Sequence, residues 1–100
     1  DDASMHRLWY DLRNQALFSE GFRDTIIKID SLLEEMVWAI IARYTELEDR
    51  KAIVSPAIAY AIFDGLFQNA LIHFLRGDVA AVEALEREAP VLLGTSTTAA

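Results

Sequence analysis

Cysteine is absent from this 100-residue chain, and its absence excludes disulfide bonds, thiolate metal sites and a cysteine nucleophile. It also fits a cytoplasmic location. Basic residues are few, because 9 Lys and Arg stand against 16 Asp and Glu and leave a net charge of −7. Nucleic-acid binding depends on basic patches that neutralise phosphates, and the longest basic run is Arg50-Lys51. We therefore do not expect this chain alone to bind DNA.

Catalytic and metal-binding motifs are lacking as well. The two histidines, His6 and His73, have no acidic partner at the spacing of metal ligands, so we expect no metal and no cofactor. Neither a glycine-rich phosphate loop nor a GxSxG nucleophile motif occurs. Acidic runs such as Glu34-Glu35 are typical of solvated faces. The sequence therefore indicates that the protein is not an enzyme.

Apolar residues are abundant instead, at 53% of the chain, which is high for a small soluble domain. They are densest between Ser55 and Gly77, where Ser-Pro and Arg-Gly are typical start and stop signals of a helix. At about 100° per residue these apolar side chains form three stripes rather than one. A helix that is apolar on every side must be covered on every side. We expect the cover to be a second copy of the protein, a bound apolar ligand, or both.

A membrane would also cover such a helix, but the segment carries several polar residues. Its large apolar residues would gain roughly 3 to 5 kcal/mol on insertion scales, and Asp64 near the middle costs about 3 kcal/mol of that. Gln68, Asn69 and His73 add to the cost. The balance predicts a soluble protein that does not span a membrane.

Hydrophobic periodicity predicts helices along the whole chain, and no alternating run indicates a strand. We expect a first helix over about 4–18 and a second over about 22–47, with a kink or break near Asp24. A charged surface connection over 46–55 follows. The third helix is the Ser55–Gly77 segment described above.

A fourth helix is expected over about 79–93, with Asp78 as its cap and Pro90 bending or shortening it. Residues 95–100 read as a flexible tail. The predicted fold class is therefore all-α, a bundle of four to five antiparallel helices that forms one domain over residues 1–94.

Three segments carry a family resemblance through their order and spacing: LWYDLRNQAL at 8–17, WAIIARY at 38–44 and IFDGLF at 62–67. Together they resemble the opening helix, the long following helix and the penultimate helix of the regulatory domain of TetR-family transcription regulators. The resemblance covers about Met5 to Gly94, and the expected fourth helix is where that family has its last helix.

The resemblance implies that the chain is the effector-binding and dimerisation domain of a cytoplasmic transcriptional repressor. DNA would be bound only through an N-terminal helix-turn-helix head, and nothing in this chain matches one. The last two helices, 56–76 and 79–93, would form a two-fold homodimer contact. An effector in the core would shift the helix leading to the head and change the spacing of two heads on DNA. The alternative is an all-helical homodimeric interaction module with no ligand pocket.

Helical stripes supply candidate residues for both sites. For an apolar or aromatic effector we expect contacts from Trp9, Arg13, Phe18, Phe22, Trp38, Phe63, Phe67 and Phe74. For the dimer interface we expect contacts from Ile58, Ile62, Gly65, Leu66, Val82, Leu85 and Ala89. Gly65 would allow the close approach of a second backbone. The helical wheel alone does not decide which stripe of helix 56–76 faces the partner, so the two assignments are interchangeable at this point.

Overall fold

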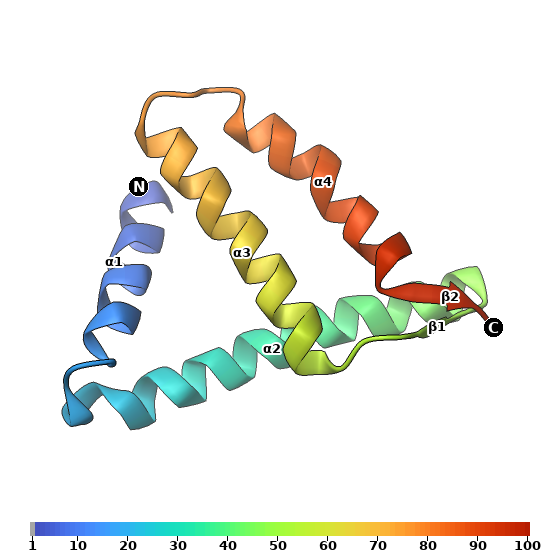
Figure 1. Cartoon of the computed structure of the whole chain (residues 1–100), viewed down its shortest axis with the longest axis horizontal. Coiled ribbons are helices and arrows are strands. Elements are labelled where there is room, and N and C mark those ends of the chain that lie inside the picture. Colours follow the sequence, from blue (N-terminus) through green and yellow to red (C-terminus); the bar gives the residue numbers. More distant parts are fainter. Residues whose placement is uncertain (1) are drawn as a thin grey trace. The chain divides into compact units, whose positions relative to one another are not determined.

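The computed structural model describes residues 2–100, and within that range it contains four helices and one small sheet (Figure 1). The elements are α1 (Asp2–Gln15), α2 (Glu20–Glu48), β1 (Arg50–Ala52), α3 (Pro56–Leu75), α4 (Ala81–Thr95) and β2 (Thr97–Ala99). Most of this range is helical, so the expected all-α class is confirmed. The chain divides into two compact units, one ending at Leu33 and the other spanning Glu34–Ala100.

The first unit holds α1, the turn after it and the first half of α2. The sequence predicts a helix that continues to Phe18, but α1 ends at Gln15. The backbone N–H groups of Phe18 and Ser19 both donate to the Gln15 carbonyl and close a turn there. Arg23 fastens this turn from α2, because its Nε donates to the Ala16 carbonyl at 2.9 Å.

Helix α2 is continuous over 29 residues. The break predicted as one alternative near Asp24 does not occur, because the helix passes through that residue without interruption. Inside the first unit α2 is linked to α1 by an ion pair in which Arg13 Nε lies 3.5 Å from Asp30 Oδ2. Ile26 supplies a buried apolar side chain on this part of α2.

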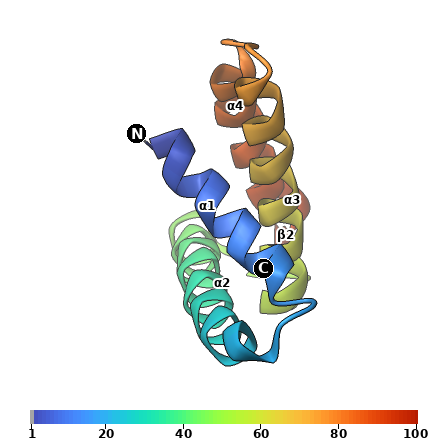
Figure 2. The same ribbon diagram turned by 90° about the vertical axis from the view of Figure 1, so that its left-hand side faces the viewer.

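The second unit has a small apolar core. Val37 and Ile41 lie one turn apart on α2, and both are buried together with Ala59 of α3. Partly buried apolar side chains pack against these three. They are Trp38, Ala52, Val54, Tyr60, Phe63 and Leu93. Beside this core α3 and α4 run next to each other, as both views show (Figure 1, Figure 2).

The ends of α3 follow the predicted signals. Ser55 Oγ accepts a hydrogen bond from the Ile58 backbone N–H at 3.2 Å, and Pro56 occupies the first turn, where no intrahelical donor is needed. After α3 ends, Gly77 adopts a φ of +104°, a backbone conformation that glycine reaches at little cost. The helix predicted between Ser55 and Gly77 is confirmed.

The start and end of α4 differ from the prediction. Asp78 Oδ1 accepts from the Ala80 N–H at 3.0 Å, so the aspartate closes the turn before α4 instead of capping the helix, which begins at Ala81. Pro90 lies inside α4 and does not end it, because the helix continues to Thr95. Pro90 has no N–H, so the backbone carbonyl of Glu86, four residues earlier, lacks its usual helical donor.

The segment predicted as a flexible tail, residues 95–100, instead contains the end of α4 and strand β2, which pairs antiparallel with β1. The Ile53 N–H donates to the Ser96 carbonyl at 2.9 Å, and Arg50 Nε donates to Thr97 Oγ1 at 2.8 Å. Sequence patterns miss the sheet because each strand has only three residues, and Arg50 and Thr97 are 47 positions apart. The compact unit therefore includes these residues, whereas the predicted domain ends at residue 94. The opposed pairs are Arg50 and Ala99, Lys51 and Thr98, and Ala52 and Thr97.

Candidate functional site

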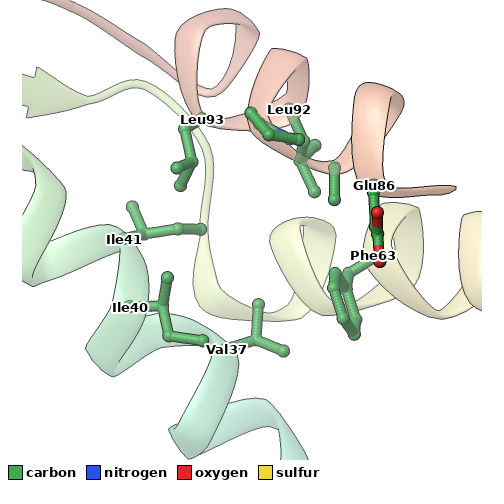
Figure 3. Close-up of a pocket in the computed structure, with 9 residues that line it drawn as sticks. Val37, Ile40, Ile41, Phe63, Glu86, Leu92 and Leu93 are labelled. Carbon is green, nitrogen blue, oxygen red and sulfur yellow. The ribbon is translucent and has the colours of Figure 1, made fainter. Parts of the chain in front are cut away.

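The second unit contains a pocket of about 310 Å³ bounded by α2, α3 and α4 (Figure 3). Its lining residues are Val37, Ile40, Ile41, Phe63, Glu86, Ala89, Pro90, Leu92 and Leu93. All of them except Glu86 have hydrocarbon side chains. The volume is at the lower end of the range of small-molecule sites, which typically combine an apolar lining with a few polar groups.

Helical spacing explains how the lining residues come together. Val37, Ile40 and Ile41 are three and four residues apart on α2 and therefore share one face. Val37 and Ile41 are buried, whereas Ile40, Glu86 and Pro90 are exposed. The pocket consequently opens to solvent beside the three exposed residues.

Arg50 is hydrogen-bonded to the C-terminal end of α4, next to the lining residues Leu92 and Leu93. In addition to its bond to Thr97 Oγ1, Arg50 Nη2 donates to the Thr97 carbonyl at 2.9 Å and to the Gly94 carbonyl at 3.4 Å. Thr97 Oγ1 donates in turn to the Leu93 carbonyl at 2.6 Å. The last carbonyls of a helix have no intrahelical donor, so these bonds satisfy them and fix the turn that carries Leu92 and Leu93.

Phe63 is the predicted effector contact that lines this pocket. Trp38 packs against the neighbouring core, and Phe67 stacks on Phe63 with ring centroids 6.5 Å apart and planes inclined by 20°. Phe74 is exposed near the end of α3. The lining of this pocket is thus mainly aliphatic, and an aromatic cavity built by the other predicted contacts stays a prediction.

The remaining predicted effector contacts lie in the first unit. Trp9 and Arg13 are partly buried on α1, and Arg13 is paired with Asp30. Phe18, in the turn after α1, is 88% exposed, and Phe22 at the start of α2 is 41% exposed. A role for these four residues in ligand binding stays a prediction.

Three predicted dimer contacts, Ile58, Ile62 and Gly65, lie on one exposed face of α3 together with Asn69 and Ile72. The five residues recur at three- and four-residue spacing, and we call them the outer face of α3. A Cβ atom added at Gly65 would meet no atom of the described residues within 4 Å. Among the described residues of the second unit, nothing therefore packs closely over Gly65.

The other predicted dimer contacts are less uniform. Val82 on α4 is 47% exposed, whereas Leu66, Leu85 and Ala89 are partly buried within the chain. Ala89 also lines the pocket. Contact of these residues with a partner stays a prediction.

The sequence analysis missed Glu86, Pro90 and Arg50 as parts of the site. On α4 the signal was present, because Glu86 shares a helical face with Ala89, Pro90 and Leu93 at spacings of three, four and seven. We overlooked this spacing because Glu86 stands among other charged residues, a pattern that is typical of a solvated helix face. No sequence pattern pointed to Arg50, because its partners Gly94 and Thr97 are 44 and 47 positions away in the sequence.

Among the described lining residues Glu86 alone is titratable, and no nucleophile or second acid stands with it. Within residues 2–100 no group of three or more His, Cys, Asp or Glu side chains could hold a metal ion.

By length and composition alone, α3 would also be able to cross a membrane, and little of it is buried within the chain. This is weak support for a membrane span, because core helices of soluble proteins meet the same criteria. Asp64 and Gln68 lie near its middle, where insertion costs the most.

Comparison of the chain with models of known protein families, with curated proteins and with solved structures finds no match.

Proposed function

We propose that the chain is a self-associating, effector-binding domain of a TetR-like transcriptional repressor, in which an apolar small molecule modulates DNA binding by a separate head domain. The observation that carries the proposal is α3, a helix of 20 residues whose one buried residue among those described is Ala59. Ile58 and Ile72 on its outer face are 52% and 59% exposed. Such a face gains stability when it is covered, since burial of apolar surface is worth about 25 cal/mol per Å².

A second copy of the chain is the cover we propose. A two-fold contact brings the same face of both copies together, so an apolar outer face on one α3 meets an equally apolar face on the other. A Cβ atom added at Gly65, in the middle of this face, would meet no atom of the described residues within 4 Å, which leaves room for the partner's backbone. Two α3 helices could then approach closely there, as glycine allows.

The pocket is the effector site in this proposal. It lies between α2, α3 and α4, so a ligand in it would touch α3 and α4, the two helices proposed to form the dimer contact. A ligand that binds one dimer arrangement better than another would shift the balance between them. The spacing of two attached heads, and therefore their affinity for a pair of DNA half-sites, would shift with it.

An interaction module without a ligand is the second candidate. The exposure of Ile40 and Pro90 beside the pocket favours it, because a partner subunit could fill the opening with its own side chains. Thermal stability measured with apolar compounds separates the two candidates. A ligand that binds the folded protein raises its melting temperature, whereas a pocket filled by the partner leaves it unchanged.

Sedimentation equilibrium at tens of micromolar tests self-association. We expect a dimer for the unmodified chain and a monomer for Ile62→Glu, which places a charge on the outer face. Ile27→Glu is the matched control, since Ile27 is an isoleucine in the first unit that is 61% exposed, against 43% for Ile62, and its substitution should leave the dimer intact. A clean monomer of the unmodified chain, or its flotation with lipid vesicles instead of dimerisation, would contradict the proposal.

A further inference from the structure

The polar character of the pocket comes from one residue. Glu86 is the sole charged residue among the described lining residues, although α4 also carries Glu83, Arg87 and Glu88. Ionised carboxylates accept hydrogen bonds and donate none. The backbone carbonyl of Glu86 is also an acceptor, and Pro90 removes its usual helical donor. Both polar groups that Glu86 offers therefore favour a donor or a positive charge.

The protein does not supply that charge itself. Within residues 2–100 the side chain of Glu86 has no hydrogen bond or ion pair. Arg43, on the same helix as Ile40, pairs with Glu46 at 3.1 Å, and Arg50 is bonded to the end of α4. The carboxylate at the pocket is thus left to solvent or to a ligand.

The charge of a ligand then determines how tightly it binds in the pocket. A neutral apolar ligand would take water away from the Glu86 carboxylate and give nothing back, which costs free energy. A carboxylic acid would add like-charge repulsion. A cation would replace the lost water with an ion pair, and it would also be attracted by the net charge of −7.

The aromatic ring of Phe63 adds a second attraction for a cation. Figure 3 shows Phe63 and Glu86 at one end of the pocket, while Ile41 and Leu93 lie toward the other end. A cationic group near an aromatic face is attracted by the negative charge density of the ring. Charge recognition and apolar recognition are thus divided between the two ends of the pocket.

We propose that this pocket takes small amphipathic cations, with an alkyl or aryl body against Ile41 and Leu92 and an ammonium group beside Glu86. This inference rests on the proposed effector-binding function and names the ligand class. Compounds with an acidic group are disfavoured by the same carboxylate.

Calorimetric titration with three octyl compounds tests the ligand class: octyltrimethylammonium, octanol and octanoate. We expect the ammonium compound to bind best and octanoate worst. Glu86→Gln, which removes the charge at an exposed position, should weaken ammonium binding about 3- to 10-fold and leave octanol binding unchanged. Glu83→Gln is the control, because Glu83 is an exposed acid one turn earlier that does not line the pocket.

The outcomes separate the inference from the function on which it rests. If octanol binds as tightly as the ammonium compound, or if the two Gln variants weaken ammonium binding equally, the cation preference is overturned. An apolar effector site would then remain in place. Failure of all three compounds to bind would overturn both the effector site and the inference, while the sedimentation result would still report on self-association. Ala89→Leu, which adds bulk to the pocket wall, should weaken all binding, and unaltered ammonium binding in this variant would place the ligand elsewhere and overturn the inference.

Discussion

The two sides of α3 have similar apolar residues and very different surroundings. The inner side, with Ala59 and Phe63, packs against Val37 and Ile41 of α2 and lines the pocket. The outer face, Ile58, Ile62, Gly65, Asn69 and Ile72, is exposed along its whole length. Composition therefore does not tell which side of an all-apolar helix its own chain covers. The uncovered side is where we expect the partner.

The largest expected effect comes from a pair of identical substitutions on the two sides. Ile41→Ala removes a side chain that is 1% exposed in the core and should lower the free energy of unfolding by about 2–5 kcal/mol. Ile62→Ala on the outer face should lower it by less than about 1 kcal/mol in dilute protein, because Ile62 is 43% exposed within the chain. Urea denaturation at low protein concentration measures both values. Similar losses for the two variants would mean that the outer face is packed within the folded monomer.

The next effect concerns the bonds that tie the end of α4 to β1. Arg50→Ala removes the donors to the Thr97 and Gly94 carbonyls and should lower the free energy of unfolding by about 1–3 kcal/mol. It should also increase the hydrogen exchange of backbone amides in residues 92–99, because β2 loses its anchor. Lys51→Ala is the control, as Lys51 is exposed in the same strand. Exchange that is equal in both variants would show that the strand pairing alone holds this segment.

The smallest effect is expected at Gly65, where one substitution should stabilise the folded monomer but weaken its association into a dimer. Gly65→Ala should stabilise the monomer by up to about 1 kcal/mol, because alanine is the better helix former and its Cβ meets no atom of the described residues. The same methyl group should weaken the dimer if two backbones approach at this point. Denaturation of dilute protein and sedimentation equilibrium give the two quantities separately. A variant that dimerises as well as the unmodified chain would move the close approach away from Gly65.

Local signals predicted the helices because they act over a few residues. The Ser-Pro start and the Arg-Gly stop expected from the sequence are found at the two ends of α3 in the structure. Where two local signals competed, the prediction failed, as at Asp78, whose carboxylate closes the turn before α4. Pro90 was expected to bend or shorten α4, yet the helix continues beyond it to Thr95.

Local sequence patterns could not predict features that depend on contacts between distant residues. The β1–β2 sheet joins three-residue strands from distant parts of the chain, and the Arg50–Thr97 bonds depend on that pairing. An effector pocket was expected among aromatic residues of the first three helices, and of these predicted contacts Phe63 lines the pocket described here. Which side of α3 is covered depends on how α2 and α4 pack against it. A single helical wheel does not contain that information.

The most direct test of the self-association of α3 uses the absence of cysteine from the chain. A single spin label on Asn69→Cys would stand on the outer face, and every copy would carry one label. In a dimer formed through this face, we predict dipolar coupling between two labels within about 30 Å, the length of a 20-residue helix. The Ile62→Glu substitution in the labelled chain should abolish the coupling. Absence of coupling in the labelled chain at tens of micromolar would contradict dimerisation through the outer face of α3.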